Sequence, residues 1–443
     1  MPRPFLKDRH HECRLRKVKC DGHRPVCLRC ERGSRDCRWS SSYTQPSPSG
    51  SQPPLPGTPS TPLGLTAPYR NSGYTSSRDP EKALQDPDVA RIFRYYVDHL
   101  AGWYDLNDSR RHFGDIVPIC ARQNSLLLSA ILAFSAASQG SSSSSRRYKD
   151  LAESYHLESV QELLSLTSDE ERFRTGETLA AICLLRSYEI ISQNVTAQSH
   201  LHGSYSLLSS LSTNIGTGLL SAGFWNYLRE DITVALIDKR SLKIDLSDRH
   251  IPPRMEGDDD LANYISYLLG KIINQCLDEQ TEPVSEDVWE CLKGELDSWK
   301  DSLRGSFDPI ETPRLYGESS FPCLWTTCGW HASSLQYYHT AMCILCLAQP
   351  SHILNTLQHI NRIKELEIKL SHHATQVCAL AISSNSAPVW VNSFGPISFC
   401  GPWLRDRQKI SELTTFLEKW GRKTGWPVAS TIDSLSRISS DVP

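Results

Sequence analysis

The 443-residue sequence has no long apolar run. Its most lipid-like stretches, residues 126–137 and 341–348, are shorter than the roughly 20 apolar residues that a helix needs to span a bilayer. The first residues also lack the apolar core of a secretory signal peptide. These absences argue against a membrane protein and against secretion, so we expect the chain to work in a reducing compartment.

Strand-like alternation is scarce as well, with brief examples at residues 241–246 and 388–391. Helical spacing of apolar residues dominates after Asp86-Pro87, a typical helix start. The tract 141–145 is expected to be a loop between helices. The sequence therefore predicts an all-α fold. The apolar stripes occur at residues 115–138, 148–165, 176–192, 219–238, 261–276, 286–304, 323–348, 355–383 and 408–420.

Common catalytic motifs are missing, because the sequence contains no HExxH, GxSxG or P-loop pattern. His339, Cys343 and Cys346 share one helix face, but their neighbours are apolar, which favours core packing over a metal site. The acids at 258–260 suit a helix N-terminus better than a magnesium site. We therefore do not expect an enzyme.

Charge is distributed unevenly along the chain, although the formal net charge is only −3. Residues 1–39 contain 12 Lys and Arg against 5 Asp and Glu, a net charge of +7, which leaves −10 for the remainder. Residues 40–79 contain 10 Ser, 8 Pro and 4 Gly. This composition predicts a flexible linker at 40–80. It separates a basic module at 9–39 from a large helical domain at 81–443.

Five of the 15 cysteines lie close together near the start of the chain, at Cys13, Cys20, Cys27, Cys30 and Cys37. In a reducing compartment, clustered cysteines more often bind metal than form disulfides. Zinc takes four ligands in a tetrahedron, and a module with so few apolar residues needs such a centre to fold. We therefore predict Zn²⁺ as the cofactor of residues 9–39.

The stretch CRLRKVKCDGHRPVCLRCERGSRDC at 13–37 resembles the fungal binuclear zinc cluster, the Zn2Cys6 DNA-binding domain of fungal transcription factors. In that family six cysteines hold two zinc ions, and the first and fourth cysteines bridge them. The resemblance implies that the five cysteines are the second to sixth ligands, with Cys27 as the bridging fourth. It places Pro25 in the loop between the two halves. It also implies that Lys17, on a basic helix in the major groove, contacts guanines of a CGG triplet.

The first ligand departs from the family pattern, because His10 stands three residues before Cys13. An imidazole nitrogen has one lone pair and cannot bridge two metal ions as a thiolate does. One outcome is a single closed site of His10 with the first three cysteines, which leaves the last three as an incomplete second site. Alternatively His11 substitutes, or the first dozen residues reflect a wrongly assigned start or exon. Both one zinc ion and two are therefore compatible with the sequence.

Basic residues between the cysteines predict contact with double-stranded DNA independently of the resemblance. Each Lys or Arg that neutralises a phosphate releases counterions and strengthens binding. Arg14, Arg16 and Lys17 fall within one turn after Cys13, and such side chains match the O6 and N7 acceptors of guanine. Arg14 and Lys19 are better suited to phosphates. A nuclear-import patch would have a similar composition.

The rest of the chain, from about residue 87 to 431, resembles the fungal-specific transcription factor domain, which in that family is helical and regulatory. The aromatic residues Trp103, Trp225 and Tyr227 are expected to be core. The resemblance rests on diffuse motifs in the family's order, LAGWYDLNDSRRHFGDIVP at 100–118, LLSAILAFSAAS at 127–138, SHLHGSYSLL at 199–208, FWNYLREDITVAL at 224–236, LQYYHTAMCILCL at 335–347 and GWP at 425–427.

These observations lead to two hypotheses. The first is a nuclear, zinc-dependent transcription regulator of RNA polymerase II genes that reads CGG-type triplets. The second is an interaction protein whose degenerate cluster no longer reads DNA. A homodimer and contacts with the transcription machinery are further expected partners, although no heptad run that would form a dimerisation coil follows the linker.

Overall fold

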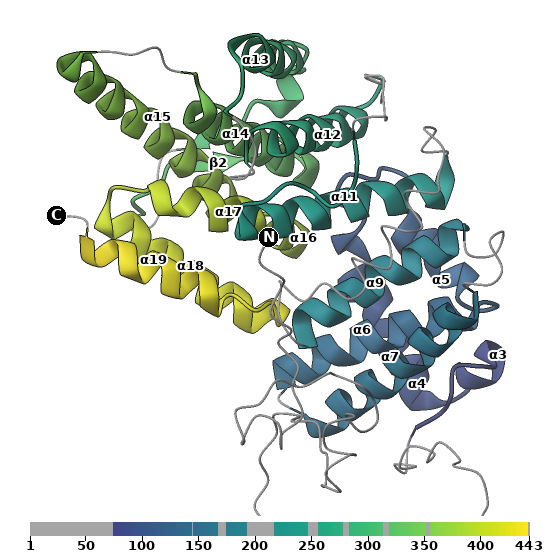
Figure 1. Cartoon of the computed structure of the whole chain (residues 1–443). Helices are drawn as coiled ribbons and strands as arrows, with labels where there is room; N and C mark the ends of the chain where they lie inside the picture. Colours follow the sequence, from purple (N-terminus) through teal and green to yellow (C-terminus); the bar gives the residue numbers. More distant parts are fainter. Residues whose placement is uncertain are drawn as a thin grey trace, which may run out of the picture. The chain divides into compact units, whose positions relative to one another are not determined.

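The structure is a computed structural model that describes residues 74–143, 145–166, 174–192, 217–246, 256–277, 283–312, 319–350 and 355–441 (Figure 1). The chain divides into two compact units, residues 1–69 and 70–443, and all described residues belong to the second. Within these ranges the second unit consists of helices and one short two-stranded sheet. The predicted all-α class is therefore confirmed.

The longer elements alternate with short turns of π-helix and 3₁₀-helix. The π-helical turns are Tyr96–Leu100 and His112–Ile116, and the 3₁₀ turns are Ala101–Trp103, Gly305–Phe307 and Gly401–Trp403. The sheet pairs β1 (Ile310–Thr312) with β2 (Cys323–Trp325) in antiparallel fashion. The α-helices are α3 (Pro80–Ala83), α4 (Pro87–Tyr95), α5 (Val117–Cys120), α6 (Ser125–Ser143), α7 (Arg146–Leu166), α9 (Gly176–Ser192), α11 (Gly218–Asp238), α12 (Asp258–Cys276), α13 (Glu286–Asp301), α14 (Gly329–Ala348), α15 (Thr356–Ile382), α16 (Ala387–Asn392), α17 (Phe394–Cys400), α18 (Arg407–Thr424) and α19 (Ala429–Asp441).

Helix α4 begins where the sequence predicts. The Asp86 side chain accepts hydrogen bonds from the N–H groups of Asp88 and Val89, and Pro87 occupies the first turn, where a missing N–H costs little. Val89 and Ile92 are buried on one face. The chain then continues through a π-helical turn into Ala101–Trp103. The chain that follows α4 thus places Trp103 in the core.

Helix α6 is the centre of the first half of the body. Every residue from 126 to 138 is buried, because α7 and α9 pack against it and α4 also contacts it. A helix that is apolar all round can be stable only when it is covered on all sides. One of its buried polar groups is paired across the helix contact, where the Ser159 hydroxyl of α7 donates to Ser129 at 2.7 Å. The Ser135 hydroxyl, in contrast, is buried without a hydrogen-bond partner among the described residues.

Helix α11 connects the two halves of the body. It packs against α9 on one side and against α12 and α17 on the other. From α12 the packing continues to α14 and then to α15, so the helices form a continuous series from α7 to α15 (Figure 1). The long α11 is therefore one element through which the first and second halves share one core, and contacts of α16 with the turn Ala101–Trp103 and of α18 with α6 also join them.

Residues just before α3 pack on α7, although the composition assigns them to the linker at 40–80. The Tyr74 and Tyr155 rings lie 5.2 Å apart. The Ser77 N–H donates to the Glu158 carboxylate at 3.0 Å. The described part of the body thus begins at Tyr74, six residues before α3.

Neither stretch of strand-like alternation in the sequence forms a strand in the structure. Residues 388–391 lie in α16, because Pro388 fits the first turn of a helix. Residues 241–246 follow α11 as an irregular segment, where the Ile244 N–H donates to the Asp231 carboxylate at 2.9 Å rather than to a neighbouring strand. The alternation of apolar and polar residues in these two stretches therefore follows from which side chains the body buries, and not from strand pairing.

Two helix boundaries also differ from expectation. The stripe at 323–348 begins with strand β2, and α14 starts only at Gly329. Helix α6 continues through much of the expected loop at 141–145 and ends at Ser143. The Ser143 hydroxyl donates to the Gln139 carbonyl at 2.6 Å, a side-chain bond that a serine can make within a helix.

Candidate functional site

The predicted zinc and DNA residues lie outside the described residues, as does the motif at 199–208, so their roles stay predictions. They are His10, Cys13, Cys20, Cys27, Cys30 and Cys37 for the metal, and Arg14, Arg16, Lys17 and Lys19 for DNA. In the described part of the chain, no group of three or more His, Cys, Asp or Glu side chains is placed to hold a metal ion. The described helices include none long and apolar enough to cross a membrane.

His339, Cys343 and Cys346 share a face of α14, but the structure does not bring them together as a metal site. The Nδ1 atoms of His339 and His373 lie 2.8 Å apart, and burial lowers the pKa of His339. Cys343 is buried, and a hydrogen bond with Cys400 raises the pKa of its thiol. The acids at 258–260 form the first turn of α12, as the sequence predicts.

A row of charged side chains is buried between α9 and α11. Arg186 of α9 pairs with Glu189 at 3.3 Å, and both side chains are no more than 2% exposed. Arg229 of α11 is 4% exposed and donates to the amide oxygens of Asn226 at 2.9 Å and Asn263 at 3.0 Å. Buried charges are costly unless they are paired or hydrogen-bonded. Such a row inside an otherwise apolar core points to a specific role.

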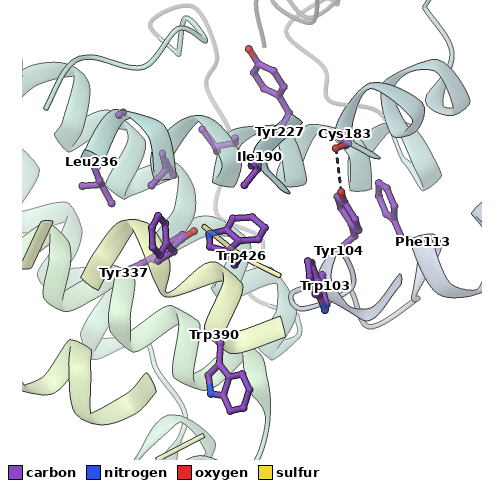
Figure 2. Close-up of a cluster of buried hydrophobic side chains, with 14 of the residues drawn as sticks. Trp103, Tyr104, Phe113, Cys183, Ile190, Tyr227, Leu236, Tyr337, Trp390 and Trp426 are labelled. Atoms are coloured by element: carbon purple, nitrogen blue, oxygen red, sulfur yellow. Dashed lines mark hydrogen bonds between the residues drawn. The ribbon is translucent and has the colours of Figure 1, made fainter. Parts of the chain in front are cut away.

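A small cavity of about 40 Å³ opens beside this row. Its apolar wall is made by Trp103, Ile190, Val391 and Trp426. The rings of Trp103 and Trp426 lie 6.0 Å apart and nearly edge to face. Figure 2 shows Ile190 pointing toward Trp426, with Trp103 and Tyr104 beside them. The cavity therefore lies where α9 and α11 meet segments from both ends of the body.

The other wall of the cavity is polar. Ser187 comes from α9, Asn226, Arg229 and Glu230 from α11, and Asn392 from α16. Three polar atoms around the cavity are buried without a hydrogen-bond partner among the described residues, the Nε1 atoms of Trp103 and Trp426 and Oε2 of Glu230. Native proteins rarely leave buried polar groups unpaired. This combination marks the cavity as the candidate site of the described body.

Trp103 and Tyr227 are buried in the core as the sequence predicts, with 6% and 1% of their surfaces exposed. Trp225 is only partly buried and packs against this core. The cavity, in contrast, is not predicted by the sequence. A signal was present, because Arg229, Glu230 and Asp231 interrupt an otherwise apolar segment of α11. The GWP motif likewise supplies Trp426, just after Gly425 ends α18 with a left-handed φ of 76°. Which of these side chains meet could not be foreseen, since they come from distant segments.

Glu230 gives this site a pH dependence. Burial raises its pKa to about 8, against the opposing effect of Arg186 and Arg229 and with a smaller contribution from Glu189. Between pH 4.5 and 8 the unfolded chain releases this proton and the folded protein keeps it, so stability falls as the pH rises. In the unmodified protein the free energy of unfolding should fall by about 1 kcal/mol per pH unit over this range, and we expect Glu230→Gln to remove this fall. Urea unfolding at pH 5 and pH 8 measures this difference in the free energy of unfolding.

The matched control is Glu418→Gln, which changes an exposed carboxylate on α18. It should leave the difference between pH 5 and pH 8 as in the unmodified protein. If Glu230→Gln shows the same decline with pH as the unmodified protein, Glu230 is ionised in the folded state and its assignment as a buried neutral acid is wrong.

Two family models match the chain. Residues 11–47 match the fungal Zn(2)-Cys(6) binuclear cluster domain, and residues 91–226 match the fungal specific transcription factor domain. The first match includes all five clustered cysteines and begins one residue after His10. The second runs from α4 into α11 and thus includes Trp103 and the charged residues of α9.

A relative of known name supports the same class. The transcription activator AMTR1 of Alternaria alternata is 20% identical, and the similarity covers 59% of this chain and 44% of that protein. The chain thus spans less than half the length of this relative. No solved structure matches the chain.

These matches make the chain similar to proteins in which a binuclear zinc-cluster domain precedes a fungal specific transcription factor domain. Over these two segments the chain is similar to fungal Zn2Cys6 transcription factors. Transcription factors are typically not enzymes, and the matched cluster domain is one that binds zinc.

Proposed function

We propose that the chain is a nuclear, zinc-dependent regulator of RNA polymerase II genes that binds double-stranded DNA at CGG-type triplets. The observation that carries this proposal is the match of residues 11–47 to the binuclear cluster domain, in a segment that also contains most of the basic residues of the +7 head. The relative named a transcription activator supports the regulatory role.

Zinc is the ion that suits this donor set. Five thiolates within 25 residues exceed the four ligands of a single structural site, so at least one Zn²⁺ can be fully coordinated. The count depends on the ligand three residues before Cys13. With His10 there, a second ion would lack the shared thiolate that the family pattern requires. The metal would supply the folding energy that this apolar-poor module lacks.

The basic residues divide into two proposed roles. Lys17 lies one turn into the basic segment after Cys13, and we assign it to guanine O6 and N7. Arg16 is a second candidate for base edges. Arg14 and Lys19 are assigned to phosphates, which fix the position of the module and carry no sequence information.

Lys17→Ala and Lys19→Ala test this division in the full chain. Lys17→Ala should weaken binding to a CGG duplex by about 1 to 3 kcal/mol and reduce the preference over a scrambled duplex. Lys19→Ala should weaken binding to both duplexes alike and reduce the slope of log affinity against log salt by about one. Titrations at several salt concentrations measure both effects. Equal losses on the two duplexes for Lys17→Ala would show that Lys17 is only a phosphate contact.

The second candidate function is an interaction protein that does not read DNA. The observation that favours it is the position of His10, which replaces the first cysteine and lies outside the matched segment. In that case the helical body alone acts, through contacts with other proteins. The two candidates differ in whether any duplex sequence is preferred.

A further inference from the structure

The cavity between α9 and α11 is not explained by zinc or by DNA. It lies within the body, and its walls come from α9, α11, α16, the turn at Ala101–Trp103 and the GWP segment. Neither family match assigns a ligand to it. The presence of buried polar groups in its wall therefore has to be explained separately from zinc and DNA binding.

The unpaired groups of the cavity are mainly donors. The indole N–H groups of Trp103 and Trp426 can only donate, and both residues are at least nine-tenths buried. Two N–H groups of Arg229 are used by amide oxygens, and a guanidinium has five. A buried donor without an acceptor costs roughly 1–3 kcal/mol, so the site is complementary to a group with several acceptor oxygens.

The charge of Arg229 indicates which class of ligand the cavity favours. Arg229 is buried, yet it forms no ion pair with a carboxylate in the described ranges, and its hydrogen bonds go to neutral amides. The neighbouring Glu230 is held in its neutral form up to about pH 8 and does not offset this charge at neutral pH. The Asp108 carboxylate acts on Arg229 only from beyond ion-pair distance, and a buried cation with no carboxylate in direct contact favours an anionic partner. By contrast, the nearby Arg186 already forms an ion pair with Glu189.

We propose that this cavity binds a small organic carboxylate whose oxygens accept from the indole N–H groups of Trp103 and Trp426 and pair with Arg229. The volume of about 40 Å³ fits a molecule of a few heavy atoms, or about three waters. The apolar wall of Ile190 and Val391 receives the short carbon chain.

Such a ligand would act as an effector. Trp103 belongs to the first segment of the body, Trp426 lies between α18 and α19, and Arg229 belongs to α11. A carboxylate held by all three joins elements that are far apart in the sequence. Binding therefore stabilises the packing of the C-terminal segment against α9 and α11. This inference goes beyond the proposed function, and the binding itself does not depend on the zinc module.

The test is thermal unfolding of the full chain with sodium formate, acetate or propionate, against sodium chloride at the same ionic strength. We expect at least one carboxylate to raise the melting temperature in a saturable manner, as a ligand of the folded state does. Propionamide, which has the size of propionate but no charge, should have at least tenfold lower affinity. Isothermal titration of the same solutions gives the dissociation constants.

Two variants tie the effect to the cavity. Trp426→Phe keeps an aromatic ring and removes the N–H, and Arg229→Gln removes the charge. Each should lower the carboxylate affinity at least tenfold. The matched control is Trp420→Phe, since the indole of Trp420 is equally buried and lacks a partner in the described body but does not line the cavity. It should bind as the unmodified protein does.

Two results would overturn the proposal. If no carboxylate differs from chloride, the cavity holds ordered water only. If Trp426→Phe and Arg229→Gln both bind carboxylate as tightly as Trp420→Phe, the anion binds elsewhere. DNA binding is measured separately, so either result leaves the proposed function untouched.

Discussion

Cys27→Ser should abolish sequence-specific DNA binding and leave the helical body folded. By the family pattern Cys27 is the ligand shared by both metal ions, and it also belongs to the closed site that His10 would complete. Its loss therefore disrupts coordination whether one zinc is bound or two. Because metal binding supplies the folding energy of such a module, specific affinity should fall at least about 10³-fold, to the non-specific level. Fluorescence anisotropy with a CGG duplex and zinc analysis by mass spectrometry measure both losses.

Cys291→Ser is the matched control, because it removes an exposed thiol from α13. Its zinc content and DNA affinity should equal those of the unmodified protein, and thermal unfolding of the body should be the same in all three proteins. If Cys27→Ser retains zinc and full preference for CGG, Cys27 is not a ligand and the assignment of the cluster is wrong.

Phe134→Ala should destabilise the body by about 3 to 5 kcal/mol, the usual cost of removing a large buried ring. Phe134 is fully buried in α6 and contacts Trp103 and Tyr104 edge on, with ring centroids 5.6 and 6.1 Å away. The Tyr104 hydroxyl is itself held by Ser187 of α9 at 2.5 Å. The substitution thus leaves a void where α6, α9 and the chain around Trp103 meet. Urea unfolding followed by circular dichroism measures the change.

Leu357→Ala serves as the control for Phe134→Ala, because Leu357 is a large apolar residue on α15 that is 68% exposed. Surface substitutions of this kind usually change stability by no more than about 0.5 kcal/mol. A loss below about 1 kcal/mol for Phe134→Ala would contradict the packing described around α6.

The sequence predicts the long helices because their period is strong and their ends carry recognisable signals. Asp86 with Pro87 starts α4, and the acids at 258–260 start α12. Short elements are not predicted, because their local pattern is decided by the body that covers them. Residues 388–391 look like a strand for this reason and are helical in the structure.

The cavity was beyond sequence reasoning for a related reason. Arg186 with Glu189 has the i,i+3 spacing of an ordinary exposed ion pair on a helix, and only the packing of α9 against α11 shows that it is buried. Trp426 lies almost 200 residues from Arg229 along the chain. The zinc ligands present the opposite case. Their spacing is local and specific, so the sequence alone predicts the five cysteines as ligands, and this assignment stays a prediction because they lie outside the described residues.

Selection from a random-sequence duplex library with the zinc-loaded full chain tests the central claim most directly. We expect duplexes that contain a CGG triplet to be enriched. The same enrichment should disappear when a chelator removes zinc or when Cys27→Ser replaces the unmodified protein. If the zinc-loaded protein enriches no sequence over the starting library, the chain does not read DNA, and the role of an interaction protein takes the place of the proposed function.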